Sequence, residues 1–469
     1  MEEVGQKMSA IQDVDLVAIQ EARQAARHAQ AVQEHLARLD EAAVDRIVAA
    51  MAAAGQEAAE ELARVTVEET GMGVYEHKVF KNRYAVGAVY EAVRRTRTVG
   101  VIWHDRERKL LGIAEPVGVV AALVPVTGPV ATVFFNSLIA LKGRNAIVFA
   151  PHPRAVKCSA AAAAMMEAAA CAAGAPPGAV QCLEHVSLPA TNELLRHPGV
   201  SLILGTGGAA MVRAAYSAGK PAIAVGPGNV PAYVDRSAAD LRQVARALVD
   251  SKSFDNGTPC AAEQSVVADR QSADALKREL RRQGAYFLRP EESVRLAGML
   301  IGPGGAMNPA VAGKSARYLA ERAGIRLPED CRVIVAEAAA VGPEEPYSAE
   351  ILAPVLAFYS VSDWRAGLER CNELLAFGGL GHTCTVWATA QEVIGAFSVQ
   401  ARAFRVLVNC PGTFGSIGHL AGLTPSFMMG TGTWGGSITS DNVGVGHLIN
   451  VRRVAYETVP WEGLGRTGS

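Results

Sequence analysis

Hydrophobic and polar positions recur along the chain with two different periods, and the change of period divides it into parts. Over residues 14–70, small and branched apolar residues recur at helical spacing among Glu and Arg. This spacing predicts helices, with Asp40 as an N-cap and Gly55 as a stop. Over residues 98–114, two short alternating runs flank the charged turn at 104–108, which predicts a protruding β-hairpin.

After Pro116 the pattern changes to short, continuously apolar runs that alternate with helical segments. Such runs predict strands that are buried on both faces, as in a parallel sheet covered by helices. The first group of runs comprises residues 117–124, 146–150, 200–204 and 222–225. Strands and helices in this order indicate a doubly wound, nucleotide-binding α/β unit.

A second α/β unit is predicted after a helix at residues 238–251 and a cluster of turn-forming residues. Its candidate strands are residues 265–268, 355–361, 383–388 and 405–408. A Gly-rich stretch follows, and the alternating run 450–456 is expected to pair across a subunit boundary with the hairpin. The predicted parts are a helical start (1–97), the hairpin (98–115), a nucleotide-binding domain (116–252), a catalytic domain (253–429) and a C-terminal segment (430–469).

Composition and charge narrow the class of protein. The chain has 469 residues, of which 50% are hydrophobic and 46 are glycine, as expected for two or three packed α/β units. The net charge of -1 argues against a nucleic-acid or membrane partner, and no apolar stretch resembles a signal or a membrane span. Eight cysteines without a CxxC pair predict reduced thiols in a cytoplasmic protein and no metal site.

Cys260 follows a run of turn formers, so its thiol is expected at the end of a loop. A free thiol has a pKa of about 8.5, and backbone N–H groups at such a turn can activate it as a nucleophile. On this evidence alone a buried structural role is the favoured interpretation, because isolated cysteines usually pack as small hydrophobic residues.

The residues around Cys260 change that interpretation. The stretch SFDNGTPCAAEQSVV, residues 253–267, closely resembles the nucleophile segment of the coenzyme A-acylating aldehyde dehydrogenases. Six more stretches are similar to landmarks of that family and occur in the family's order: residues 115–124, 145–155, 219–235, 350–361, 378–383 and 408–418. The resemblance runs from about Ala22 to the C-terminus and is strongest to the aldehyde dehydrogenase half of bifunctional aldehyde-alcohol dehydrogenases.

The resemblance implies a fold, a reaction and partners. The fold is an aldehyde dehydrogenase-like α/β fold with a cofactor domain, a catalytic domain and a small β arm for assembly into a homodimer or homotetramer. The reaction is attack of Cys260 on an aldehyde, hydride transfer to NAD or NADP, and release of the acyl group to coenzyme A. No metal is implied.

The resemblance also implies a cofactor-binding set: Thr206, Gly207, Gly208, Glu350, Leu352, Pro151 and Arg154. The glycine turn follows a predicted strand and precedes a helix, a place that can bind a pyrophosphate but is also an ordinary turn. Glu350 matches the glutamate that holds the nicotinamide ribose, although by itself it reads as a surface carboxylate. Arg154 is either a partner for the 2′-phosphate of NADP or a solvated residue at a helix start.

Two features near the predicted substrate site matter most: one distinguishes an acylating from a hydrolytic enzyme, and the other departs from the family's pattern. Hydrolytic relatives activate water with a glutamate, whereas the matching stretch here, AVGPGNVP at residues 224–231, has no carboxylate. The family has asparagine in its oxyanion site where this chain has Gly128, after Thr127. The predicted substrate and coenzyme A cleft comprises Thr127, Gly128, His382 and Phe414, with Trp434 as a further pocket residue.

Two other functions remain open at this stage. A hydrolytic aldehyde dehydrogenase is disfavoured by the missing base. A catalytically silent protein of the same fold, acting in binding, is suggested by Gly128. The natural aldehyde is left open.

Overall fold

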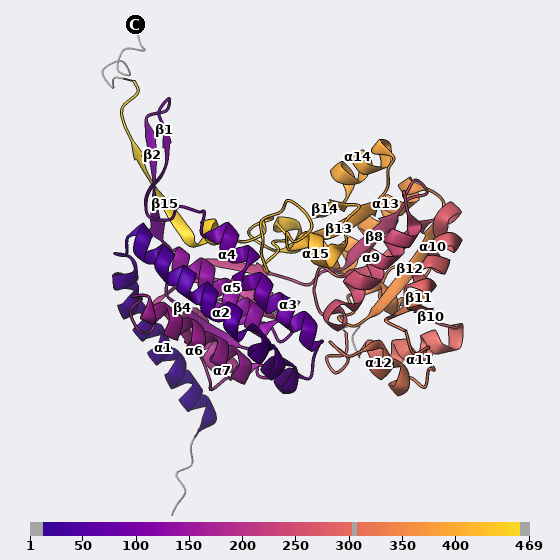
Figure 1. Cartoon of the computed structure of the whole chain (residues 1–469), viewed down its shortest axis with the longest axis horizontal. Helices are drawn as coiled ribbons and strands as arrows, with labels where there is room; N and C mark the ends of the chain where they lie inside the picture. Colours follow the sequence, from indigo (N-terminus) through magenta and orange to yellow (C-terminus); the bar gives the residue numbers. More distant parts are fainter. Residues whose placement is uncertain (1–12, 303–306, 460–469) are drawn as a thin grey trace, which may run out of the picture.

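The computed structural model describes residues 13–302 and 307–459. Figure 1 shows two α/β lobes side by side, with a narrow β arm that projects from the N-terminal lobe. Each lobe is built on its own parallel sheet, in agreement with the predicted α/β class. In the described residues, no helix combines the length and the apolar character that crossing a membrane would need.

The N-terminal lobe contains a five-stranded parallel sheet in the order β5-β4-β3-β6-β7. Its central strand β3 is buried at every position, as its continuous apolar sequence predicts. The strands are β3 (Val119–Val124), β4 (Ile147–Pro151), β5 (Val180–Cys182), β6 (Val200–Thr206) and β7 (Ala222–Val225). The covering helices are α1 (Val14–Leu36), α2 (Glu41–Thr70), α3 (Tyr75–Val86), α4 (Ala88–Val93), α5 (Pro129–Lys142), α6 (Val156–Ala172), α7 (Leu188–Arg196) and α8 (Ala209–Tyr216).

Helix α2 shows one boundary that the sequence predicted and one that it did not. The side chain of Asp40 caps its first turn by accepting a hydrogen bond from the Ala43 N–H at 2.7 Å. The predicted stop at Gly55 is wrong, because the helix continues to Thr70 and ends at Gly71 with φ of 62°. Gly55 instead allows close packing, since a Cβ there would lie 2.5 Å from Val86 Cγ1.

The C-terminal lobe contains a seven-stranded parallel sheet in the order β10-β11-β12-β9-β8-β13-β14. Its strands are β8 (Val230–Val234), β9 (Glu263–Asp269), β10 (Ala285–Phe287), β11 (Val333–Glu337), β12 (Val355–Val361), β13 (Gly381–Trp387) and β14 (Ala403–Val408). Because β8 pairs with β9 and β13, the chain crosses from one sheet to the other between Val225 and Val230. That crossing lies earlier than the predicted boundary at residue 252.

The helices of this lobe are α9 (Leu241–Ser253), α10 (Arg270–Arg282), α11 (Pro290–Leu300), α12 (Ala316–Arg322), α13 (Trp364–Leu374), α14 (Gln391–Gln400) and α15 (Gly412–Ser416). Short helical turns are η1 (Phe254–Gly257), η2 (Pro346–Ser348), η3 (Leu375–Gly379), η4 (Thr433–Gly435) and η5 (Val445–Leu448). The turn η1 joins α9 to the loop that carries Cys260.

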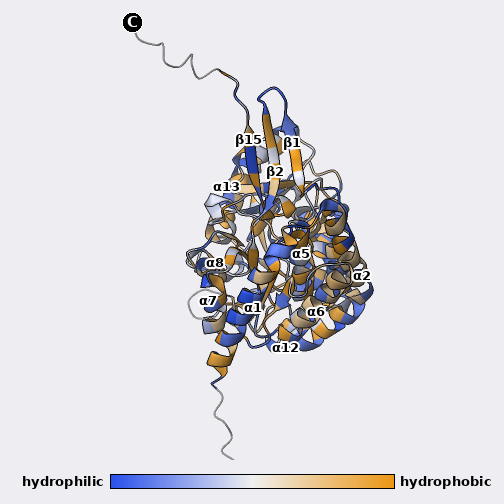
Figure 2. Cartoon of the chain, turned by 90° about the vertical axis from the view of Figure 1, so that its left-hand side faces the viewer, coloured by the Kyte–Doolittle hydropathy of each residue, from blue (hydrophilic) through white to orange (hydrophobic). Residues whose placement is uncertain are grey.

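The β arm is a three-stranded antiparallel sheet of β1 (Gly100–Asp105), β2 (Leu110–Pro116) and β15 (Ile449–Ala455). It stands clear of the body of the molecule in Figure 2. The last strand does pair with the hairpin, but the pairing observed is between β15 and β2 of the same chain. The reason is local: the Asn145 side chain binds the Leu448 carbonyl at 2.8 Å and holds the start of β15 beside β2.

Candidate active site

A cavity of about 330 Å³ lies where the two lobes meet. Four segments that follow strands of the five-stranded sheet line it: residues 125–128 after β3, His152 after β4, residues 206–208 at the end of β6, and residues 226–227 after β7. Strand order reverses between β3 and β6, and ligands of open α/β sheets bind at this kind of switch point. The C-terminal lobe closes the cavity with residues 258–261, Glu350 and Leu352.

Cys260 reaches the cavity because the loop before it is tightly bent. Asp255 and Asn256 adopt φ of 51° and 53°, and Gly257 has φ of 71°. A side chain at Gly257 would collide with the Ala353 carbonyl, 2.5 Å from the Cβ position, so only glycine fits there. The predicted nucleophile is partly buried and lines the cavity.

The surroundings of Cys260 determine the state of its thiol. Burial, followed by the nearby charge of Glu350, raises its pKa to about 12. The charges of Arg405 and Lys81 and the Cys260 backbone N–H act in the opposite direction. Thiolate formation therefore depends on positive charge and N–H donors around the sulfur.

The glycine turn at Thr206, Gly207 and Gly208 also lines the cavity. Gly208 is the N-cap of α8, has no side-chain cap, and faces open space at its Cβ position. Thr206 Oγ1 is buried without a hydrogen-bond partner in the described residues. Uncapped N–H groups at a helix start and an unsatisfied hydroxyl suit the pyrophosphate of a dinucleotide, so these residues fit a nicotinamide cofactor.

Glu350 lies on the opposite wall, and its Oε1 accepts a hydrogen bond from the Gly228 N–H at 2.9 Å. Burial raises its pKa to about 7. The adjoining backbone is held by the Gln264 amide oxygen, which accepts from the Ile351 N–H at 3.0 Å and from Lys252 Nζ at 2.8 Å. Among the described residues that line the cavity, Glu350 is the one carboxylate.

Five residues that the sequence suggested for the site do not line the cavity: Pro151, Arg154, His382, Phe414 and Trp434. Pro151 ends β4, and the guanidinium of Arg154 is engaged by the Thr70 carbonyl at 2.9 Å. His382 is buried in β13 behind Gly228, and burial lowers its pKa to about 3, so it stays neutral.

Phe414 and Trp434 are displaced from the cavity for reasons of packing. Phe414 stacks edge-on against Phe80 and Phe254, whose rings face the cavity instead. Trp434 is 53% exposed and packs on Phe404 at the surface. Thr127 and Gly128 line the cavity.

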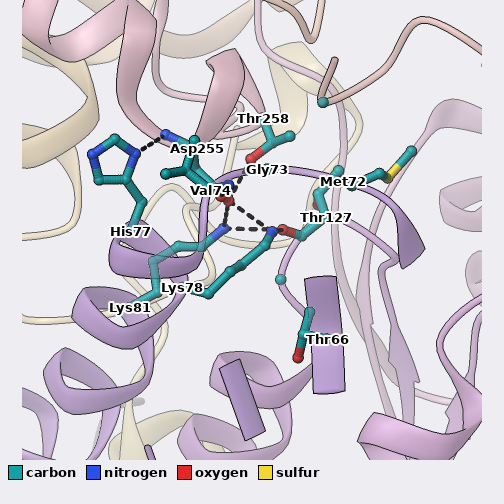
Figure 3. Close-up of polar contacts among 12 residues, drawn as sticks. Thr66, Met72, Gly73, Val74, His77, Lys78, Lys81, Thr127, Asp255 and Thr258 are labelled. Carbon is teal, nitrogen blue, oxygen red and sulfur yellow. Dashed lines mark hydrogen bonds and ion pairs between the residues drawn. The ribbon is translucent and has the colours of Figure 1, made fainter. Parts of the chain in front are cut away.

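A buried charged cluster that the sequence did not predict lies beside the cavity and is formed by Lys78, Lys81 and Asp255 (Figure 3). Both lysines lie on α3 and bind Asp255 Oδ2, which also accepts from Thr258 Oγ1 at 2.7 Å. Burial alone would raise the pKa of Asp255, but the two ammonium groups outweigh it and hold the pKa at about 2. The available signal was two lysines three positions apart in one helix, which is too common to single out.

The arrangement can perform chemistry at a carbonyl carbon: the Cys260 thiol, the Lys81 amine and the start of α8 line one largely apolar cavity. No group of three or more His, Cys, Asp or Glu residues in the described part of the chain is placed to hold a metal ion.

Comparisons with known proteins show what the chain is similar to. The model of the aldehyde dehydrogenase family matches residues 5–287. The chain is 41% identical to aldehyde-alcohol dehydrogenase 2 of Entamoeba histolytica over 88% of its length, but spans only 48% of that relative.

Two solved structures are similar over nearly their whole chains. The first, an acetylating aldehyde dehydrogenase from Geobacillus thermoglucosidasius, is 44% identical with a TM-score of 0.94, covering 96% of this chain and 99% of that one. The second, a propionaldehyde dehydrogenase from Rhodopseudomonas palustris with bound coenzyme A and an acylated cysteine, is 28% identical with a TM-score of 0.83, covering 93% and 97%.

Proposed function

The chain belongs to the aldehyde dehydrogenase family, and on that premise we propose that it is a coenzyme A-acylating aldehyde dehydrogenase. It converts an aldehyde, coenzyme A and oxidised NAD or NADP to acyl-coenzyme A, the reduced cofactor and a proton. The observation that carries this proposal is Cys260 in a shared cavity whose 224–231 wall has no carboxylate to activate water.

Cys260 begins the reaction as its thiolate. Its sulfur attacks the aldehyde carbon, a C–S bond forms, and the carbonyl π pair moves to oxygen to give an oxyanion. The bound nicotinamide ring supplies a hydride acceptor. When the oxyanion reforms its C=O bond, hydride leaves the carbon and an acyl thioester remains on Cys260. The thiol of coenzyme A then loses its proton and attacks that carbon, and the pair of the breaking C–S bond returns to Cys260.

Protein groups around the cavity hold the reactants and keep water away. Thr206, Gly207 and Gly208 would hold the pyrophosphate, and Glu350 and Leu352 would lie against the nicotinamide end. Phe80 and Phe254 make the substrate side apolar. Because residues 224–231 carry no carboxylate to activate water, the thioester is left to a thiol. The acetylating relative and the relative with bound coenzyme A support this choice of acceptor.

The assembly and location follow as further proposals. The projecting β arm supports a homodimer or homotetramer, because its β1 strand exposes Val101 and Trp103. Eight unpaired cysteines support a reducing, cytoplasmic location.

The test is a panel of aldehydes assayed with NAD and NADP, with and without coenzyme A. We expect sustained reduction of the cofactor only when coenzyme A is present, with acyl-coenzyme A as the product. The matched control is Cys260→Ala, which should abolish turnover and leave cofactor binding intact. Sustained turnover without coenzyme A, or turnover by Cys260→Ala, would refute the proposal.

A further inference from the structure

By its resemblance to the acylating family, Gly128 stands where that family carries an oxyanion-binding asparagine, and in the structure Lys81 lies next to it. A Cβ built on Gly128 would meet Lys81 Nζ at 3.5 Å and Lys81 Cε at 4.0 Å, which are ordinary contact distances. The φ of Gly128 is -157°, which lies outside the positive range that favours glycine. The group nearest to the position of a Cβ is the Lys81 amine.

Lys81 Nζ is held in place by two acceptors. It donates to the Thr127 carbonyl at 2.9 Å and to Asp255 Oδ2 (Figure 3). Asp255 is itself fixed, because its other oxygen accepts from the Val74 N–H at 2.9 Å. An ammonium group has three N–H donors, so Lys81 retains one beyond these two bonds. Lys81 also lines the cavity that contains Cys260 and Gly128.

Lys78 makes the same two contacts but lies elsewhere. Its Nζ binds the Thr127 carbonyl at 2.6 Å and Asp255 Oδ2 at 2.7 Å. Its side chain is 2% exposed, against 10% for Lys81, and it does not line the cavity. Two lysines therefore bind one carboxylate, and of the two Lys81 lines the cavity that contains Cys260.

We propose that Lys81 Nζ donates its third N–H to the substrate oxygen and stabilises the oxyanion in place of the asparagine that this chain lacks. The inference rests on the proposed function. When the Cys260 sulfur bonds to the carbonyl carbon, the π pair develops negative charge on oxygen, and the Lys81 N–H and the Cys260 backbone N–H share that charge. No proton leaves Lys81, and the same contact serves again when coenzyme A attacks the thioester. The charge of Lys81 also favours the Cys260 thiolate, because it lowers the pKa of that thiol.

The experiment compares Lys81→Met with Lys78→Met, which removes the same pair of bonds outside the cavity. Acylation is measured as the single-turnover burst of reduced cofactor without coenzyme A, alongside cofactor affinity and melting temperature. We expect Lys81→Met to slow acylation about 100- to 1,000-fold, the usual effect of losing one oxyanion donor. Lys78→Met should slow it less than about tenfold, with a similar change in melting temperature.

Rescue separates an oxyanion donor from a structural lysine. Adding Gly128→Asn to Lys81→Met returns an amide donor to the site and is expected to raise the acylation rate at least about tenfold. Should Lys81→Met fail to fold, Lys81→Leu, which also lacks a donor, takes its place with the same expectation, tested with and without Gly128→Asn.

Three outcomes overturn one claim or the other. Equal slowing by Lys81→Met and Lys78→Met, or no rescue by Gly128→Asn, overturns the role of Lys81 while leaving the proposed function standing. Wild-type turnover that ignores coenzyme A overturns the proposed function instead, and that result is visible before any variant is made.

Discussion

Asp255 is the residue whose replacement most directly tests how the two lobes are held around the nucleophile. It lies in η1 of the C-terminal lobe, whereas its partners Lys78 and Lys81 lie on α3 of the N-terminal lobe. Asp255→Asn keeps the size of the side chain but leaves two buried ammonium groups without a counter-charge. Breaking a buried pair in this way costs about 3–5 kcal/mol, because an uncompensated charge stays out of water.

The pKa values of the cluster give the sign of the pH dependence. The pKa of Asp255 falls from 3.8 to about 2, where the attraction of the lysines exceeds the effect of burial. This difference stabilises the fold by about 2 kcal/mol above pH 4 and is lost as the pH falls through about 2. Burial lowers the pKa of Lys78 from 10.5 to about 8, so the neutral amine is preferred in the fold and stability rises with pH through that range.

Without Asp255, Lys78 should lose its proton at a still lower pH than in the wild type. The stability gap between Asp255→Asn and wild type should therefore narrow between about pH 6 and about pH 9. Scanning calorimetry should show a melting temperature lower by about 3–5 °C at the acid end, because the unfolding entropy of a chain of 469 residues amounts to about 1 kcal/mol per degree. Asp235→Asn is the control, because Asp235 is buried but bonded to the Tyr233 hydroxyl and the Ser237 N–H. An unchanged melting temperature in Asp255→Asn, or a gap as wide at high pH as at low pH, would refute the reasoning.

Two further predictions use the same site. Glu350→Gln should speed alkylation of Cys260 by iodoacetamide, measured by peptide mass spectrometry. The reason is that removing the negative charge lowers the pKa of the thiol. Each pKa unit by which it falls raises the thiolate fraction about tenfold. The advantage over wild type should grow as the pH rises through about 7, where Glu350 becomes charged, and a constant ratio would contradict it. Gly73→Ala should lower the melting temperature more than Gly71→Ala: both have positive φ, but a Cβ at Gly73 would lie 2.0 Å from Asp255 Oδ1. Equal decreases in melting temperature would show that the positive φ alone, and not the contact with Asp255, determines the loss of stability.

Local sequence patterns predicted most of the strands and failed where the pattern was short or interrupted. The buried run 355–361 coincides with β12, because a continuous apolar stretch between turns has few alternatives. Strand β8 was not predicted because it is five residues long and contains Pro231. Gly55 was misread as a stop, because the contact that requires glycine comes from Val86 of another helix.

The site shows the same division between local and distant information. Cys260 and the turn at Thr206–Gly208 are readable because each motif is contiguous, and the structure places both in one cavity. Phe414 was expected there on the strength of its segment alone, but its ring direction is set by Phe80 and Phe254. The sequence around Gly128 gives no sign of Lys81, because Lys81 lies on α3, which is separated from Gly128 along the chain by α4 and by three strands.

The position of the nucleophile is therefore a property of the contact between the lobes as much as of its own loop. Asn256 Nδ2 binds the Gly313 carbonyl at 3.0 Å within the C-terminal lobe. Asp255, in contrast, forms ion pairs with two lysines of the N-terminal lobe. Both lysines also bind the carbonyl of Thr127, next to Gly128. Any movement that parts the lobes would therefore displace the loop before Cys260 and the peptide beside Gly128 together. The ion pairs and hydrogen bonds of Lys78 and Lys81 therefore tie the loop before Cys260 and the peptide beside Gly128 to one helix, α3.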